Sequence, residues 1–172
     1  MAFIDWKQEY ELGVATMDNT HREYITWLNT LDDASDDDFL KELDGFVAHT
    51  QAHFDQEERW MRNSMFPAAD CHGGMHAEIL KIIVFVRGRV ASGEFQLGRD
   101  LVRELGPWFD DHAEGMDTAL AKWINGIGYN TETGESAVPR EKLEAALGKK
   151  PKAEEKESAC CSSESGSSCS GH

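Results

Sequence analysis

The sequence has few basic residues. Only 17 lysines and arginines oppose 32 aspartates and glutamates, which gives the 172-residue chain a formal net charge of −15. An acidic surface of this kind repels the phosphates of nucleic acids and the headgroups of anionic lipids, so neither is expected as a partner. The length suits a single domain.

Long hydrophobic runs are missing as well. The longest run, residues 82–86, is too short to span a bilayer, and no charged segment followed by an apolar one opens the chain. We therefore expect no membrane association and no secretion by a standard signal peptide, which leaves the cytoplasm as the expected compartment. Of the four cysteines, only Cys71 precedes the final 24 residues, so a disulfide framework is excluded as the organising principle.

Strand-like alternation is also absent, whereas helical periodicity occurs four times in the first 126 residues. The first helix is predicted to begin at Asp18 as its N-cap, and the second follows the acidic residues 36–38 and ends before Pro67. The third begins at about Asp70 and the fourth at about Leu97. Similar lengths and short connections predict an all-α fold, an antiparallel up-down-up-down four-helix bundle preceded by an N-terminal arm.

Composition divides the chain into three parts. Residues 1–126 form the predicted bundle, and residues 127–148 are a connection that can form at most a short helix. Residues 149–172 are a Ser/Cys-rich tail that we expect to be disordered, because such a composition cannot bury a core. The tail is neutral overall, so the acidic excess belongs to residues 1–148. No defined site is expected for the tail residues Cys160, Cys161, Cys169 and His172.

Histidines and carboxylates recur on the helix faces that should be buried. Each of two helices carries a pair four residues apart, which places both side chains on one face. Without a metal, such a set would leave a dense cluster of unpaired polar groups in the core. Nitrogen and oxygen donors suit iron, manganese or zinc, and seven donors are too many for one ion, so two ions bridged by carboxylates are predicted. The seven residues are His21, His53, Glu57, His72, His76, His112 and Asp117.

The fourth predicted helix contains two irregular features. His112 and Asp117 are five residues apart, about 140° around an ideal α-helix, so they do not share a face. Either a local bulge at Gly115 or a centre flanked by both sides of the helix would reconcile this spacing. The pair Gly106-Pro107 is expected to kink or restart the helix ahead of His112.

These motifs resemble the hemerythrins, and specifically the single-domain bacterial bacteriohemerythrins, over roughly residues 6–124. The resemblance is carried, in chain order, by His21, His53-Phe54-x-x-Glu57-Glu58, His72-x-x-x-His76 and Trp108-x-x-x-His112-x-x-x-x-Asp117. It implies a non-heme di-iron centre that binds dioxygen reversibly for storage, delivery or scavenging, without catalytic turnover.

The resemblance also implies a role for each ligand. One iron would take His72, His76 and His112 and keep an open position, and the other would take His21 and His53. The two irons would be bridged by an oxo or hydroxo group and by the carboxylates of Glu57 and Asp117.

By the same resemblance, an oxygen pocket is walled by Tyr24, Phe54, Trp108, Phe109 and Ala113. Two of these depart from the family pattern, which usually has a branched aliphatic residue at the position of Ala113 and leucine at that of Tyr24. Either Tyr24 fills the space that Ala113 leaves, or its hydroxyl brings a hydrogen-bond donor near the bound oxygen. We hypothesise faster oxidation to the ferric state than in typical members. A compensated packing exchange without functional effect remains equally open.

Other functions also remain open at this stage. They are a sensor of oxygen, nitric oxide or redox state, a di-iron enzyme acting on peroxide or nitric oxide, and a structural bundle without metal. His49 is expected to have no ligand role, and Cys71 is expected to be an ordinary thiol because it points away from the neighbouring His72. An acidic surface without an evident apolar patch favours a monomer.

Overall fold

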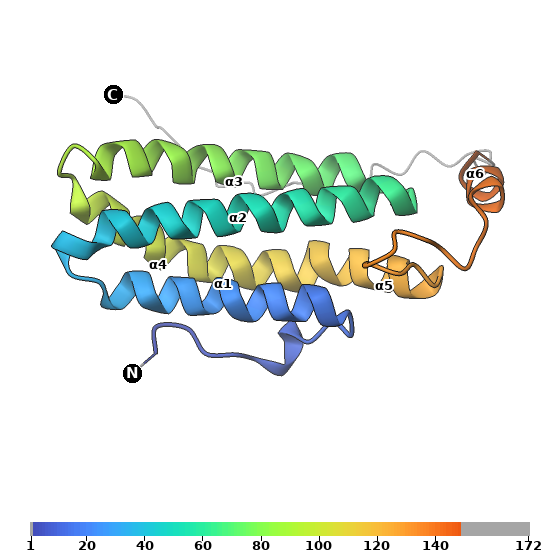
Figure 1. Cartoon of the computed structure of the whole chain (residues 1–172), viewed down its shortest axis with the longest axis horizontal. Helices are drawn as coiled ribbons and strands as arrows, with labels where there is room; N and C mark the ends of the chain where they lie inside the picture. Colours follow the sequence, from blue (N-terminus) through green and yellow to red (C-terminus); the bar gives the residue numbers. More distant parts are fainter. Residues whose placement is uncertain (1, 149–172) are drawn as a thin grey trace, which may run out of the picture.

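The computed structural model describes residues 2–148, and every regular element within this range is helical. A 3₁₀ turn, η1, lies in the N-terminal arm, and a π-helical segment, η2, follows the fourth helix. The elements are η1 (Gln8–Tyr10), α1 (Ala15–Asp33), α2 (Asp36–Ser64), α3 (Ala69–Val90), α4 (Phe95–His112), η2 (Ala113–Asp117), α5 (Thr118–Gly126) and α6 (Arg140–Gly148). The predicted all-α class is confirmed (Figure 1).

Four long helices form a closed bundle. α1 packs against α2 and α4, and α3 packs against the same two helices. The connections 34–35, 65–68 and 91–94 are short, so consecutive helices are antiparallel neighbours that lie side by side along the long axis (Figure 1). η2 and α5 continue the line of α4. This is the predicted up-down-up-down arrangement, with the N-terminal arm running beside α1.

The helix starts differ partly from the sequence-based prediction. α1 begins at Ala15 rather than at Asp18, so the prediction that Asp18 is the N-cap is wrong. Asp18 is buried instead, and its Oδ1 accepts a hydrogen bond of 2.8 Å from the backbone N–H of Leu12. The carboxylate therefore ties the N-terminal arm to the bundle. The cap of α2 is Ser35, whose Oγ accepts from the Asp38 N–H at 3.3 Å, and the acidic residues that follow favour the positive end of the helix.

α4 runs through Pro107 as one continuous helix, so the predicted restart at this point is wrong. Proline removes one backbone donor, but the residues around it are held by packing: Leu105, Gly106 and Phe109 are all buried. Gly106 also lies close to the ring of Phe3 from the N-terminal arm. The arm therefore packs over the point where the helix lacks a hydrogen bond.

The interior consists of two hydrophobic clusters separated by a polar layer. One cluster includes Leu28, Phe46, Ile83 and Leu105, and the other includes Met17, Trp60, Phe66 and Leu120. Along the chain, the buried histidines and carboxylates lie close to the points where residues of one cluster are succeeded by residues of the other. The polar layer consists of His21, His53, Glu57, His72, His76, His112 and Asp117.

The connection after α5 folds back on the second cluster. Ile127, Tyr129 and Leu143 are buried there, and Leu143 belongs to α6. The predicted tail, residues 149–172, lies outside the described residues, as do its cysteines and His172. Within residues 2–148, no helix is both long enough and apolar enough to span a membrane.

Candidate metal centre

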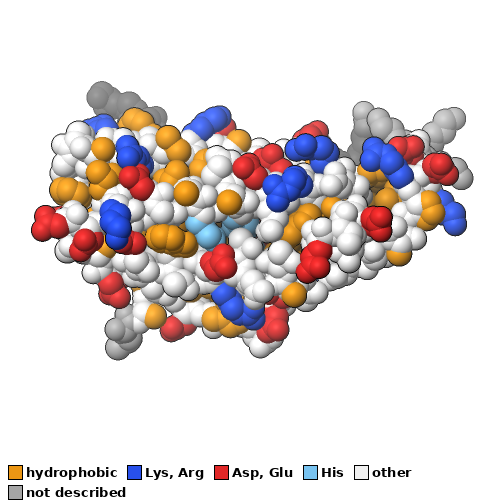
Figure 2. Space-filling view, viewed as in Figure 1, with side chains coloured by type: hydrophobic (Ala, Val, Ile, Leu, Met, Phe, Trp, Pro, Cys, Tyr) orange, Lys and Arg blue, Asp and Glu red, His pale blue; other side chains and the backbone are white. Residues whose placement is uncertain are grey.

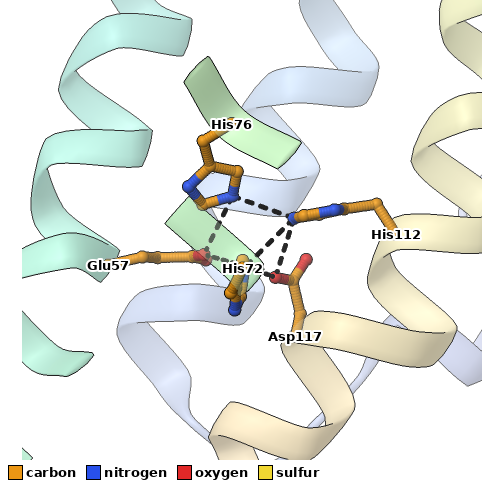
Figure 3. Close-up of side chains that lie close together, drawn as sticks. All are labelled: Glu57, His72, His76, His112 and Asp117. Atoms are coloured by element: carbon orange, nitrogen blue, oxygen red, sulfur yellow. Dashed lines mark hydrogen bonds and ion pairs between the residues drawn. The ribbon is translucent and has the colours of Figure 1, made fainter. Parts of the chain in front are cut away.

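Three histidines bring their Nε2 atoms to one point. His72 and His76 lie one turn apart near the start of α3, and His112 is the last residue of α4. His112 Nε2 is 3.1 Å from His72 Nε2 and 2.9 Å from His76 Nε2, and the three side chains point toward one another (Figure 3). Since each neutral imidazole carries a single ring proton, three such nitrogens cannot all be satisfied by one another. A cation at their meeting point would satisfy all three.

The two carboxylate oxygens of Glu57 are directed toward different histidines. Its Oε2 lies 3.3 Å from His72 Nε2 and 3.6 Å from His76 Nε2. Its Oε1 lies 3.1 Å from His53 Nε2 and 3.9 Å from His21 Nε2. The carboxylate therefore stands between the group of three histidines and the pair formed by His21 and His53.

Asp117 also lies between the two histidine groups, opposite Glu57. Its Oδ1 lies 3.1 Å from His72 Nε2 and 3.3 Å from His112 Nε2, and its Oδ2 lies 3.2 Å from His21 Nε2. Each carboxylate thus offers one oxygen to either histidine group. This is the donor arrangement needed to bridge two cations.

Several of these buried atoms have no hydrogen-bond partner. His21 Nε2, Glu57 Oε2 and both carboxylate oxygens of Asp117 are unpartnered, although all three side chains are fully buried. Leaving a buried polar group unsatisfied costs about 1–3 kcal/mol, and more when the group is charged. Imidazole nitrogens and carboxylate oxygens are the ligands that iron, manganese and zinc accept. The residues present therefore fit a metal centre.

The electrostatics of the metal-free cluster favour the ligand forms of most groups. Burial and the neighbouring Asp117 would raise the pKa of Glu57, but His53 and His72 outweigh them and lower it to about 2. Burial also opposes ionisation of Asp117, yet His112, His21 and His72 hold its pKa well below the usual range. Burial lowers the pKa of His76 to about 3. Both carboxylates are thus charged at neutral pH and His76 is neutral, the forms that bind cations.

His21 and His72 are the exceptions. Burial opposes protonation of His21, but Asp117 and Glu57 outweigh it and raise the pKa of His21. The same causes act on His72. Burial opposes its protonation, but the carboxylates of Asp117 and Glu57 outweigh burial and raise the pKa of His72 to about 9. In the metal-free protein this imidazole holds a proton that balances part of the negative charge of the two carboxylates. A bound cation would replace that proton.

The segment η2 explains how His112 and Asp117 reach the same site. The backbone N–H of Thr118 bonds to the carbonyl of Ala113, an i→i+5 bond that defines a π turn, and the Thr118 hydroxyl donates to the same carbonyl at 3.0 Å. The wider turn contains Gly115 and carries Asp117 toward His112 (Figure 3). The bulge is therefore the correct one of the two explanations that the sequence left open.

The grouping of donors agrees with the sequence-based assignment, but the numbers bear on where an open position would lie. The group of His72, His76 and His112 is joined by one oxygen from each carboxylate, which makes five protein donors. The pair of His21 and His53 is joined by the other two oxygens, which makes four. The sequence analysis gave the open position to the three-histidine group. The less complete donor set is that of the two-histidine group, so an ion held there would have fewer protein ligands than an ion held by the three-histidine group.

The predicted pocket residues divide between the two groups. The ring of Tyr24 stacks on Phe109, with centroids 4.9 Å apart, and lies 6.1 Å from the ring of His53. Phe109 in turn meets His21 edge to face at 5.3 Å. Tyr24 and Phe109 therefore border the two-histidine group. The Tyr24 hydroxyl is buried without a partner, and burial raises its pKa.

The remaining pocket residues lie at the three-histidine group. Phe54 stacks on His76 with centroids 3.8 Å apart, and Trp108 stacks on His112 at 4.6 Å. Ala113 directly follows His112 and is fully buried. Phe54 also lies against His53, with centroids 5.4 Å apart, so it contacts both histidine groups. Trp108 packs on the three-histidine group, whereas Tyr24 and Phe109 pack on the two-histidine group.

Two further residues, His49 and Tyr10, lie near the centre without belonging to the donor set. His49 lies outside the cluster, where its Nε2 is 3.1 Å from Glu23 Oε2 at the surface. Tyr10, which the sequence analysis missed, packs edge to face against Phe109 at 5.1 Å, and its hydroxyl donates to Asp110. No local pattern could have identified Tyr10, because its partners lie about a hundred positions away in the chain.

Comparisons with known proteins agree with this geometry. Residues 12–124 match the family model described as "Hemerythrin HHE cation binding domain". The chain is 41% identical over 124 residues to a bacteriohemerythrin of Ralstonia nicotianae, an alignment that covers 72% of this chain and 90% of the relative. It is 29% identical over 128 residues to a bacteriohemerythrin of Stenotrophomonas maltophilia, which covers 72% and 83% of the two chains. A bacteriohemerythrin of Pseudomonas aeruginosa is 25% identical over 121 residues, or 68% and 78% of the two chains.

Proposed function

Because this chain belongs to the hemerythrin family, we propose that it binds dioxygen reversibly at two non-heme iron ions and serves oxygen storage, delivery or scavenging without catalytic turnover. The observation that carries the proposal is the position of Glu57 and Asp117, each with one oxygen toward either histidine group. Two bridging carboxylates with five imidazoles form a donor set for a pair of ions rather than for one.

The proposed ligands follow the two groups of donors. His72, His76 and His112 would hold one iron, and His21 and His53 would hold the other. Glu57 and Asp117 would each give one oxygen to either iron, and an oxo or hydroxo group would complete the centre. When bound, a ferrous pair supplies two electrons for the reversible binding of dioxygen. Two carboxylates among seven ligands leave the centre poor in anionic donors, which favours binding of oxygen over oxidation of other substrates.

The protein's own contribution is to keep water away from the open side. Tyr24 and Phe109 are fully buried beside His21 and His53 and form an aromatic wall. Excluding water protects a reactive centre from displacement of its ligand and from loss to the oxidised state. On the other side, the rings of Phe54 and Trp108 fix the planes of His76 and His112 by stacking.

The test is the visible absorption spectrum of anaerobically reduced, iron-loaded protein, recorded after addition of oxygen and again after its removal. A charge-transfer band that forms with oxygen and disappears on degassing is expected. A band that persists as an oxidised ferric centre would contradict a carrier and favour a sensor, or an enzyme that acts on peroxide or nitric oxide. Protein that contains no iron after expression with iron would contradict the proposed centre itself.

A further inference from the structure

A row of metal-ligand side chains runs along α2 from the surface into the interior. His49, His53 and Glu57 are spaced by four residues, so they lie on one face of the helix about one turn apart. Their side chains are 14%, 3% and 0% exposed. His53 and Glu57 belong to the candidate metal centre. His49 lies one turn outside it, with its ring centroid 6.2 Å from that of His53.

A surface pocket between α1 and α2 contains the outer part of this row. Its volume is about 380 Å³, and both His49 and His53 line it. Figure 2 shows histidine atoms at the surface near the middle of the molecule, on the face where Figure 1 places α1 and α2 side by side. His53 is 4% exposed, more than any other of the seven candidate ligands. A solute in this pocket therefore meets one of those ligands.

Two donors from different helices meet in the same pocket. His49 Nε2 of α2 lies 3.1 Å from Oε2 of Glu23, which belongs to α1. Two donors that bind one ion at about 2.1 Å and at right angles to each other lie about 3.0 Å apart. The spacing of His49 and Glu23 thus suits two neighbouring positions around one cation.

The charges of the pocket favour a cation. Burial lowers the pKa of His49, although Glu23 opposes this effect, so the imidazole is neutral at pH 7 and does not balance the charge of the carboxylate. The lining also contains the carboxylate of Asp55 and the guanidinium of Arg59, so two negative charges face one positive charge. The whole chain carries a net charge of −15. Cations are therefore concentrated near this pocket.

We propose that Glu23 and His49 form a transient site for a divalent cation, through which iron enters the candidate metal centre. The inference rests on the proposed function. Two protein donors hold an ion weakly, which suits a site that passes its ion on. His53 is the next donor along α2, and its Nε2 lies 3.1 Å from Glu57 Oε1. Each step inward leads to a more buried and more complete donor set, so the ion is retained at the centre.

Access from the three-histidine group is more restricted. His76 and His112 are each 1% exposed, and the rings of Phe54 and Trp108 stack on them. An ion arriving there would have to displace an aromatic ring before it met a ligand. The row along α2 needs no such displacement at its outer end, because His49 and Glu23 already border the pocket.

The rate of iron uptake tests the proposal. Metal-free, full-length protein is mixed anaerobically with Fe²⁺, the reaction is stopped at intervals with a chelator that removes unbound iron, and the iron bound to the protein is measured. His49→Ala and Glu23→Gln should each slow the uptake by at least about fivefold. Neither residue belongs to the final ligand set, so the final iron content should be unchanged, and circular dichroism should show an unchanged fold.

Glu78→Gln is the matched control. It removes the same charge as Glu23→Gln from a carboxylate of similar exposure, 73% against 66%, but on the outer side of α3. Its iron uptake should proceed at the rate of the unaltered protein. A control variant that is slowed as much as Glu23→Gln would show that only the net charge matters, and would overturn the proposed site.

Binding at the site is measured separately with Mn²⁺. Iron-loaded protein is titrated with Mn²⁺, whose electron paramagnetic resonance signal decreases when the ion binds. One further, weakly bound ion per chain is expected, and it should be lost in His49→Ala and Glu23→Gln but retained in Glu78→Gln. If His49→Ala and Glu23→Gln take up iron and bind Mn²⁺ as the unaltered protein does, the proposal is wrong. A lower final iron content in His49→Ala would also overturn it, because His49 would then support the centre itself.

These measurements do not depend on oxygen. An absorption band that persists after degassing would contradict the proposed carrier function and leave the uptake and Mn²⁺ results valid. Protein that takes up no iron would contradict the proposed centre, and the Mn²⁺ titration would still decide whether Glu23 and His49 bind a cation.

Discussion

His112 and Asp117 are five residues apart, yet His112 Nε2 lies 3.3 Å from Asp117 Oδ1. A regular α-helix would turn Asp117 away, and only the π turn at Ala113–Asp117 allows one element to supply both an imidazole and a carboxylate to the same site. Asp117 also reaches His21 across the bundle with its other oxygen. This local irregularity of the helix therefore completes the donor sets on both sides.

Removing the bridging capacity of Asp117 should lower the metal content. Asp117→Asn replaces one carboxylate oxygen by an amide group that donates hydrogen bonds and does not bind a cation. We expect fewer than two ions per chain after loading with iron, measured by mass spectrometry of the metal. Asp111→Asn, an exposed position one residue before His112, should bind as much iron as the unaltered protein. Equal iron content in both variants would show that Asp117 is not a bridging ligand.

The stability of the metal-free protein should fall as the pH rises. The pKa of His72 is raised from an ordinary 6.5 to about 9 by Asp117 and Glu57, so its contribution to stability is fully present below pH 6.5 and is lost as the pH rises through about 9. The loss is on the order of 3 kcal/mol. Urea unfolding at several pH values should show it. In the metal-loaded protein His72 has no such proton to lose, so an identical pH dependence of both forms would contradict this explanation.

The hydroxyl of Tyr24 should cost stability. It is buried without a hydrogen-bond partner, so Tyr24→Phe should raise the free energy of unfolding of the metal-free protein by about 1 kcal/mol. Tyr10→Phe is the matched comparison and should lower it, because the Tyr10 hydroxyl donates to Asp110. Urea denaturation measures both variants. Equal destabilisation by the two substitutions would show that Tyr24 has a partner in solution.

Tyr24 should also influence the lifetime of the oxygen-bound protein. Its ring lies beside Phe109 and His53, on the side with fewer donors, and Tyr24→Leu restores the residue that the family usually has there. We expect the oxygen-dependent absorption band of this variant to decay severalfold more slowly. Tyr24→Phe separates the hydroxyl from the ring, because it removes only the former. An unchanged decay rate in both variants would assign Tyr24 to packing alone.

The helical bundle and its polar layer could be predicted from the sequence alone. Apolar residues repeating every three to four positions require helices that bury one face, and pairs such as His53 with Glu57 and His72 with His76 share a face by spacing alone. These properties are local, so they could be read without knowing how the helices pack. The bulge at Gly115 was also within reach, because a spacing of five residues conflicts with a regular helix.

Which atoms lie close together could not be predicted from the sequence, because it depends on how the helices pack. The distribution of the four carboxylate oxygens over two histidine groups depends on contacts between residues far apart in the chain. It leaves the smaller set of donors on the side of His21 and His53. Packing also decided that α4 passes through Pro107 and that Asp18 holds the arm instead of capping α1. The exposed face of α3 could not be predicted either. A run of apolar residues such as 82–86 shows that burial is favourable, but only the arrangement of the neighbouring helices shows which of those side chains remain uncovered.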